Sequence, residues 1–259
     1  MSDYIDSKIR ARINQKLKKD THTSLQDGFK GRKTINEVLD KPTVMTLHKM
    51  ITDGTISGVD GSVGAGKESL LFLGEDTDSK HIALKIYLVT TSNFKRRIKY
   101  IQGDPRFSKF RKNTRSIVHL WAQKEFKNLT VASQTSVCVP KPIRVLNNVL
   151  AMEFIGQDGK PAPTLLSCAV DENDYKEAIR MIQQLYMKGG LVHGDFSEYN
   201  VFKTGKGLVL FDLGSAVDRR HPSAESFLYR DINNINRFFT KRSVLTRETS
   251  AILKEMSIW

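Results

Sequence analysis

The sequence predicts an α+β fold in two lobes, a small strand-rich lobe followed by a helical lobe, with extra helices ahead of both. Short apolar runs separated by Gly, Asn and Asp turns fill residues 55–155, a pattern typical of strands. Apolar residues three to four positions apart then indicate helices over 173–188, 225–239 and about 246–256.

The most informative stretch runs from Leu191 to Asp212, where polar residues end two apolar runs. Asp195 follows the first run, Asn200 precedes a hairpin predicted over 201–211, and Asp212 ends its second strand. Phosphoryl transfer needs such a trio: a carboxylate for the proton of the attacking hydroxyl, and an amide and a carboxylate to hold magnesium. The alternative is that all three are turn residues, which explains one Asp better than it explains this spacing.

This pattern resembles the catalytic and metal-binding loops of protein kinases. Residues 193–195 read His-Gly-Asp where kinases have His-Arg-Asp, and residues 212–214 read Asp-Leu-Gly where kinases have Asp-Phe-Gly. The resemblance implies that Asp195 and Asp212 are catalytic and that Asn200 and Asp212 are metal ligands. The segment after Asp212 is short, so a long activation segment is missing.

Four segments follow from this layout. Residues 1–33 hold a basic helix, with Ile or Leu at every fourth position, and a linker; a frayed terminus is the alternative for that helix. Residues 34–54 hold helices packed on the domain, announced by a Thr-x-x-Glu capping box and a Pro in a first turn. Residues 55–155 form the small lobe up to the hinge, and residues 156–259 form the helical lobe.

Composition and net charge limit the compartments and partners that we expect for this chain. The chain has 259 residues, 39% of them hydrophobic, and no apolar run approaches the ~20 residues that span a bilayer. The start is unlike a signal peptide, and Cys138 and Cys168 lack metal-site spacing, so we expect a cytoplasmic protein with reduced thiols and no membrane partner. The net charge of +13, from 41 basic and 28 acidic residues, suggests a polyanionic partner such as RNA, although a solvated basic surface explains it too.

A glycine-rich stretch lies at residues 56–73. Residues 61–67 read Gly-x-x-x-x-Gly-Lys, but the next residue is Glu, where a Walker A loop needs Ser or Thr. The flanks read strand–loop–strand, as in a kinase glycine loop. A hairpin without function is the alternative; otherwise we expect the phosphates of ATP to be covered by Ser62, Lys67, Glu68 and Ser69.

Lys85 lies within the apolar strand predicted over 81–89. Burying a lysine there is costly unless it meets an anion, and Ile-Ala-Leu-Lys is close to the Val-Ala-Ile-Lys of kinases. The partner that we expect is Glu125, on the apolar side of a helix over 115–130. A surface salt bridge with a neighbouring lysine is the alternative for Glu125.

Two further apolar runs, 143–146 and 149–155, are joined by Asn-Asn, which suits a tight hairpin. In a kinase-like layout the second run leads into the hinge. Backbone groups near Met152, Glu153 and Ile155 would there bind adenine.

In the helical lobe, Asn173 or Asp174 is expected to cap the helix over 173–188, which Gly189 and Gly190 end. Asp231 lies within the apolar stripe of the helix over 225–239. It anchors the catalytic-loop backbone or pairs with a nearby arginine.

Residues 94–115 form a basic loop with interleaved aromatics and a single acid, Asp104. Basic residues neutralise phosphates and aromatics stack on bases, which favours RNA contact, but such runs are also often solvated. Ser108 and Thr114 are candidate phosphorylation sites in this loop.

Together these residues resemble the RIO family of atypical serine/threonine-protein kinases, from about Thr34 to Phe239. The capping box ahead of the domain and the lack of room for a winged-helix domain are typical of the Rio-one branch. Gly-Asp-Phe at residues 194–196 is instead more similar to the Rio-two branch. The motifs that carry the resemblance are Gly-Ala-Gly-Lys-Glu-Ser (64–69), Lys85, Trp-Ala-Gln-Lys-Glu (121–125), Met-Glu-Phe-Ile (152–155), residues 191–200, and His-Pro-x-Ala-Glu-Ser (221–226) with Arg230 and Asp231.

The resemblance implies a two-lobed kinase fold without the usual substrate-docking elements. It also implies ATP with magnesium or manganese, serine autophosphorylation with Ser108 as the candidate, and a role with rRNA in maturing the small ribosomal subunit. A related ATPase activity through an aspartyl-phosphate would make Asp212 a phosphoacceptor as well.

Two rival functions share these motifs. A small-molecule kinase of the aminoglycoside or choline type would need a larger helical region after Asp212, and a basic surface suits a cationic substrate poorly. A non-catalytic RNA-binding assembly factor that uses ATP as a switch is the second rival. The loss of its RNA affinity with salt would be unaffected by Asp195→Ala.

Overall fold

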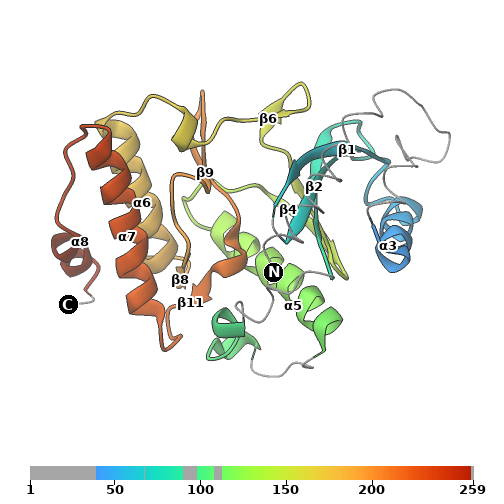
Figure 1. Cartoon of the computed structure of the whole chain (residues 1–259), viewed down its shortest axis with the longest axis horizontal. Coiled ribbons are helices and arrows are strands. Elements are labelled where there is room, and N and C mark those ends of the chain that lie inside the picture. The colour runs from blue at the N-terminus through green and yellow to red at the C-terminus, as the bar shows by residue number, and fades with distance from the viewer. Residues whose placement is uncertain (1–38, 67, 90–97, 108–112, 258–259) are drawn as a thin grey trace, which may run out of the picture. The chain divides into compact units, whose positions relative to one another are not determined.

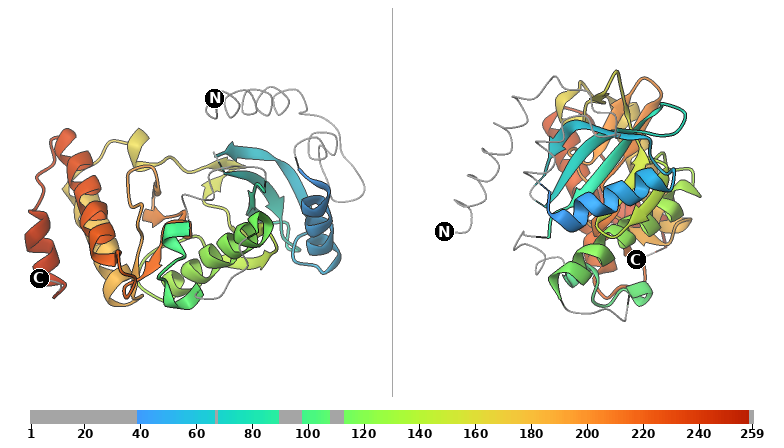
Figure 2. Two further views of the ribbon diagram at one scale, coloured as in Figure 1. Left: turned by 60° about the horizontal axis from the view of Figure 1, so that its bottom comes forward. Right: turned by 90° about the vertical axis from the view of Figure 1, so that its right-hand side faces the viewer.

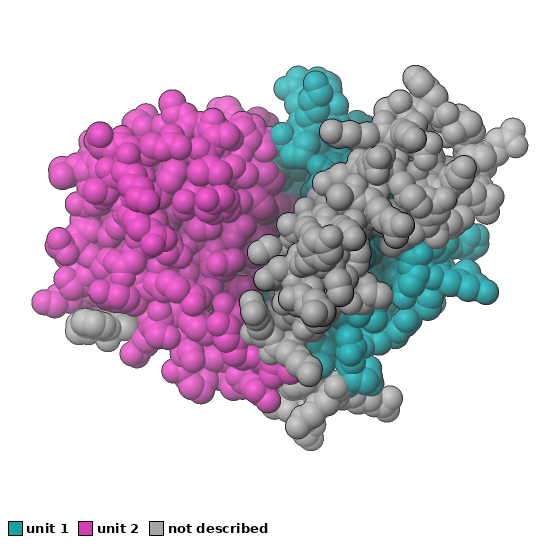
Figure 3. All heavy atoms as spheres, in the orientation of Figure 1, with its two compact units in different colours: residues 1–94, 112–123, 142–161 teal, residues 95–111, 124–141, 162–259 magenta. Residues whose placement is uncertain are grey.

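The computed structural model describes residues 39–66, 68–89, 98–107 and 113–257. The helix and linker expected over residues 1–33, the capping box at 34–37, Lys67 and Ser108 lie outside these ranges. The chain forms two compact units, coloured separately in Figure 3. Unit 1 comprises residues 1–94, 112–123 and 142–161, and unit 2 comprises residues 95–111, 124–141 and 162–259.

An antiparallel sheet of five strands dominates unit 1 (Figure 1), and the strand-rich character predicted for residues 55–155 is confirmed. The strand order is β1-β2-β3-β5-β4. A two-residue pair, β6 and β7, follows the sheet. The strand bounds are β1 Gly58–Ala65, β2 Ser69–Glu75, β3 His81–Tyr87, β4 Pro142–Leu146, β5 Val149–Glu153, β6 Gly156–Gln157 and β7 Lys160–Pro161.

Helix α3 (Lys41–Thr52) covers one side of this sheet, as the views in Figure 2 show. Leu47 and Met50 on the helix are fully buried with Leu84 and Ile86 of β3. Asp40 caps the helix by accepting the Thr43 N–H at 3.0 Å. The helix predicted from the Pro in its first turn is therefore confirmed, with its end at Thr52.

A buried asparagine ties the helix to the sheet. Asn148, in the turn between β4 and β5, donates to the Thr43 hydroxyl at 2.9 Å and to the Tyr87 carbonyl at 2.9 Å. Its neighbour Asn147 has a φ of 51°, in the left-handed region. Asparagine adopts this conformation readily, which is why the Asn-Asn pair predicted a tight turn.

Helices and short strand pairs make up unit 2. The helices are α6 Glu172–Met187, α7 Ala224–Lys241, α8 Thr249–Glu255 and the second half of α5 Thr114–Ser133. Strand β9 (Val201–Thr204) pairs with β10 (Gly207–Leu210), and β8 (Leu191–Val192) pairs with β11 (Val217–Asp218). Four single 3₁₀ turns span Ile98–Tyr100, Pro105–Phe107, Leu165–Ser167 and Leu213–Ser215.

Helices α6 and α7 lie side by side (Figure 1) and bury the apolar stripes that predicted them. Tyr175 on α6 meets the Phe239 ring edge-on and donates its hydroxyl to Asn236 at 2.8 Å. The expected cap of α6 is wrong by two to three residues: Asp171 accepts the N–H groups of Asn173 and Asp174. The side chain of Asp174 accepts the Asp171 N–H in return, which completes a capping box.

None of the helices that the described ranges contain has the length and apolar character of a membrane span.

Candidate active site

The β9–β10 hairpin in unit 2 brings together the residues singled out at its two ends. Val201 pairs with Leu210, and the Phe211 N–H donates to the Asn200 carbonyl at 2.9 Å. Asn200 and Asp212 therefore leave the hairpin from neighbouring positions. The Asn200 side-chain N–H₂ donates to the Asp195 carbonyl at 2.9 Å and lies 3.5 Å from its carboxylate.

Asp212 adopts a backbone conformation that is uncommon for a residue with a side chain. Its φ and ψ are both 58°, in the left-handed region. Such backbone strain is concentrated at functional positions, because only surrounding structure that fixes the residue can maintain it. The Phe202 and Phe211 rings stack at 3.9 Å and fix the hairpin just before this residue.

His193 joins the catalytic loop to the chain before Asp212. The buried imidazole lies between two backbone groups: Nε2 is 3.3 Å from the Phe211 carbonyl, and Nδ1 accepts the Asp195 N–H at 3.3 Å. This pair of partners requires a neutral ring with its proton on Nε2. The ring thus orients Asp195 through backbone contacts.

Asp231, on α7, binds the backbone of the catalytic loop on both sides of Asp195. Its fully buried carboxylate accepts the N–H of Gly194 at 2.7 Å and that of Phe196 at 3.0 Å. Arg230 donates to the Gly194 carbonyl, so adjacent residues of one helix bind both polar groups of Gly194. The expectation that Asp231 anchors this loop is confirmed. Burial raises the pKa of Asp231 to about 7, although both N–H bonds oppose that shift.

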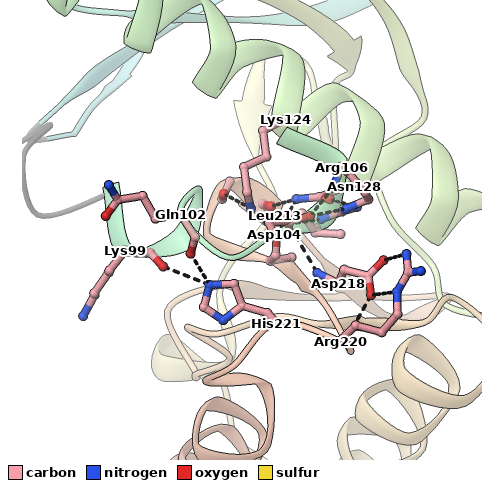
Figure 4. Close-up of polar contacts among 12 residues, drawn as sticks. Lys99, Gln102, Asp104, Arg106, Lys124, Asn128, Leu213, Asp218, Arg220 and His221 are labelled. Carbon is pink, nitrogen blue, oxygen red and sulfur yellow. Dashed lines mark hydrogen bonds and ion pairs between the residues drawn. The ribbon is translucent and has the colours of Figure 1, made fainter. Parts of the chain in front are cut away.

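Two fully buried side chains of α5 hold the loop after Asp212 (Figure 4), and no role for either was predicted from the sequence. Lys124 donates to the Gly214 carbonyl at 3.1 Å and to the Ala216 carbonyl. Asn128 donates to the carbonyls of Leu213 and Ala216, both at 2.8 Å. Three carbonyls of this turn, those of Leu213, Gly214 and Ala216, therefore have a donor from one helix. Burial lowers the pKa of Lys124 to about 7.

The basic loop expected over residues 94–115 contributes to the same network (Figure 4). Arg106 pairs with Asp104 through two bonds of 2.9 and 2.7 Å and donates to the Asn128 side-chain oxygen at 2.8 Å. Asp104 is almost completely buried. Burial acts to raise its pKa, but the hydrogen bonds and charge of Arg106 outweigh that effect and hold it below the usual value. Arg106 is thus part of the packed structure rather than a phosphate contact on a solvated loop.

The same segment makes a second attachment. The His221 Nε2 lies 2.8 Å from the Gln102 carbonyl and 3.0 Å from the Lys99 carbonyl, and the Asp218 N–H donates to Asp104 at 3.4 Å. Residues 98–107 are therefore bound both to α5 and to the chain after Asp212.

The glycine-rich strand pair in unit 1 is irregular where it was expected to meet phosphates. Register shifts between β1 and β2 lie on both sides of Ser62, whose hydroxyl is 3.3 Å from the carbonyls of Gly64 and Leu71. The Gly66 N–H donates to the Ser69 carbonyl at 2.8 Å and closes the tip, on which Glu68 also lies. The observed strand–loop–strand order agrees with a kinase-type loop.

Lys85 is buried in the middle of β3, with its ammonium 5.4 Å from the centre of the Tyr87 ring. Its strand pairs with β5, so that Leu150 lies opposite Lys85 and Met152 opposite Ala83. Glu153 ends β5 as an exposed residue, and Ile155 follows it half-buried.

Glu125 is fully buried on α5, which excludes a surface salt bridge. Its pairing with Lys85 stays a prediction.

Comparison with known proteins shows the family to which this chain belongs. Residues 70–252 match the RIO domain family. The chain is 36% identical over 219 residues to the Homo sapiens serine/threonine-protein kinase RIO1, although the match spans only 39% of that protein. It is 38% and 35% identical to the RIO-type serine/threonine-protein kinases Rio1 of Haloferax volcanii and Methanocaldococcus jannaschii, covering 73% and 84% of their lengths.

Solved structures support the same fold. The Rio2 kinase of Chaetomium thermophilum, in a complex described as ADP/Mg²⁺-phosphoaspartate, aligns with a TM-score of 0.61 at 23% identity. That alignment covers 82% of this chain and 65% of the other. The fold is thus a kinase-like α+β fold, as the sequence predicted.

Proposed function

Since this chain belongs to the RIO family of serine/threonine-protein kinases, we propose that it transfers the γ-phosphoryl group of ATP to a serine or threonine hydroxyl. The observation that carries the proposal is the contact of Asn200 with both Asp195 and the residue before Asp212. The hairpin and the loop before it therefore carry all three groups that the reaction needs. The Asp195 carboxylate would take the hydroxyl proton, and the side-chain oxygens of Asn200 and Asp212 would bind a metal.

In this reaction the substrate hydroxyl oxygen attacks the γ-phosphorus, and the bond from that phosphorus to the β–γ bridging oxygen breaks. ADP leaves with the electron pair of that bond. The hydroxyl proton passes to the carboxylate of Asp195, which the ring of His193 and the carboxylate of Asp231 hold through the loop backbone. A positioned base of this kind contributes on the order of 10²–10⁴-fold to the rate.

The residues present fit a magnesium or manganese ion. The Asn200 nitrogen is turned toward Asp195, so its oxygen is the atom left for a metal. Together with the Asp212 carboxylate it offers the hard oxygen ligands that Mg²⁺ prefers, with waters filling the remaining positions. When bound, the ion would neutralise charge on the phosphates.

In unit 1, we assign ATP contacts to the glycine-rich strand pair and its neighbours. Lys85, with Glu125 as its proposed partner, would bind phosphate oxygens. The remaining phosphate contacts would come from Ser62, Lys67, Glu68 and Ser69, and adenine would meet the backbone of Met152, Glu153 and Ile155. The ADP and Mg²⁺ in the Rio2 kinase complex support ATP and magnesium as ligands of this family.

A second activity, ATP hydrolysis through Asp212, is favoured by the phosphoaspartate in that same complex. An Asp212 oxygen would attack the γ-phosphorus and release ADP. Water would then cleave the acyl phosphate to give inorganic phosphate and the free carboxylate. The left-handed backbone of Asp212 supports a special role for this side chain.

For the biological setting, we propose the maturation of the small ribosomal subunit, with rRNA as a partner and the chain itself, at Ser108, as one protein substrate. The net charge of +13 supports a polyanionic partner. Both cysteines are free thiols, which supports the cytoplasm as its compartment.

Incubation with γ-labelled ATP and magnesium tests the proposal, using the wild type, Asp195→Ala, Asp212→Asn and, as a control on an exposed turn, Asp78→Ala. We expect acid-stable label on serine, lost with Asp195→Ala and retained in the control. Label that is sensitive to hydroxylamine and lost chiefly with Asp212→Asn would show the aspartyl-phosphate cycle. Absence of any label, with ATP still bound, would overturn both activities and favour an ATP-switched binding factor.

A further inference from the structure

A hollow of about 320 Å³ lies in unit 2, where the end of α6 meets β11. Two chain segments that are far apart in sequence form it, and the Arg219 N–H joins them by donating to the Gly190 carbonyl at 2.8 Å. The paired strands β8 and β11 fix this junction. Residues around the hollow include Lys188, Gly189, Gly190, Asp218, Arg219 and Arg220.

The hollow carries a net positive charge, even though one of its arginines is paired with an aspartate. Asp218 binds Arg220 through two hydrogen bonds of 2.9 and 3.0 Å, and the bond from Arg220 is the main cause of its lowered pKa. Lys188 and Arg219 are exposed, and within the described ranges neither side chain makes an ion pair or a hydrogen bond. Two cations are therefore left to face a ligand.

The helix end does not account for these cations. The Lys188 and Gly189 N–H groups donate to the Gln184 carbonyl at 2.9 and 3.3 Å, and the Gly190 N–H donates to the Tyr186 carbonyl at 3.1 Å. Backbone donors thus already bind the carbonyls of Gln184 and Tyr186 in the last turn of α6, and the ammonium of Lys188 makes no hydrogen bond there. Arg219 belongs to the other segment, where no helix ends.

Cations around a concave surface with glycine backbone suit a phosphate group, because arginine can bind two phosphate oxygens at once. None of the residues that line the hollow is aromatic, so it offers no platform for stacking a base. It suits contact with a nucleic-acid backbone, which positions a partner without reading its sequence. The charge of +13 over the whole chain favours a polyanion over an isolated acidic side chain.

We propose that this hollow binds phosphodiester groups of RNA through Lys188 and Arg219. The inference rests on the part of the proposed function that names RNA as a partner, and it supplies the docking surface. Strand β8 leads directly into His193, and β11 follows the loop that Lys124 and Asn128 hold. A docked RNA would therefore lie against the strands that carry both active-site loops.

The test measures the affinity of the full chain for a fluorescent single-stranded oligouridylate over a series of KCl concentrations. Variants are Lys188→Gln/Arg219→Gln and a charge-matched control, Lys241→Gln/Lys254→Gln, which alters exposed lysines of α7 and α8. Loss of two phosphate contacts should lower the slope of log affinity against log salt by about 1.4, at about 0.7 per contact on single strands. We expect at least a tenfold loss of affinity at low salt in the first variant and a small loss in the control.

Equal losses in both double variants would overturn the proposal, because any two cations would then serve. Unchanged RNA affinity in Lys188→Gln/Arg219→Gln would overturn it too, and so would an acidic peptide that displaces the RNA from the wild type but fails to bind this variant. Autophosphorylation with labelled ATP, measured on the same samples, should be unchanged. That readout separates failure of this surface from failure of the kinase assignment.

Discussion

The side-chain amide of Asn128, on α5, donates a 2.8 Å hydrogen bond to the carbonyl oxygen of Leu213, the residue that follows Asp212. A second bond of 2.8 Å runs from the same nitrogen to Ala216. The oxygen of this amide accepts from Arg106, so every part of the side chain has a partner. One buried amide thus fixes the turn behind the proposed metal ligand.

Asn128→Leu keeps the branching of the side chain at Cγ and removes these bonds. We expect the free energy of unfolding to fall by about 2–4 kcal/mol, since each buried group left without a partner costs about 1–3 kcal/mol. Denaturant titration measures the change. Gln123→Leu, which alters an exposed amide on the same helix, serves as the control and should change stability by less than about 0.5 kcal/mol. Equal effects of both variants would refute the role given to this amide.

Lys124 should make stability depend on pH. In the folded chain its pKa is lowered to about 7 from the ordinary 10.5, so between these values the unfolded chain binds more protons. Stability from this group therefore rises with pH across that window, by at most about 1.4 kcal/mol per pH unit, and is lost as pH falls through about 7. Lys124→Met should remove this slope. Urea titrations of both proteins across the window measure it, and parallel curves would contradict the lowered pKa.

Asp231→Asn replaces an acceptor of two backbone N–H groups with a side chain that can accept through one oxygen only. Because the catalytic loop loses one of these bonds, Asp195 should be misplaced. We expect kcat to fall on the order of 10–100-fold, with the KM for ATP nearly unchanged. Glu225→Gln, an exposed change at the start of the same helix, is the control. A fall in stability with full activity would limit Asp231 to a structural role.

Much of the fold could be predicted because its elements carry strong local patterns. The apolar strand around Lys85 and the Asn-Asn turn both appeared where expected. Local competition limited the detail: Asp171, Asn173 and Asp174 are all good caps, and only the backbone shows that the helix begins after Asp171. The hairpin that unites Asn200 with the chain before Asp212 followed from its turn and apolar runs.

The network around α5 could not be predicted, because its partners lie about 90 residues apart in the chain. Lys124 and Asn128 each follow a polar residue, and polar residues of a helix are expected at its surface. Their burial depends on backbone carbonyl groups of a loop that is distant in sequence. Every residue has a backbone carbonyl, so the residue types of that loop do not show which carbonyls will bind a side chain. Asp104 was equally hidden, as one acid in a basic stretch that resembled a solvated loop.

Gly194 separates this chain from kinases that have arginine between the His and the Asp of the catalytic loop. Its φ is +75°, and a Cβ there would lie 3.1 Å from the Ser215 carbonyl, so any side chain at this position would be strained. Activation by a phosphorylated loop depends on arginines that bind the new phosphate. With glycine fixed at this position, the residue between His193 and Asp195 offers no guanidinium to bind such a phosphate. If the proposed kinase activity holds, activation through an arginine at this position is closed to the chain.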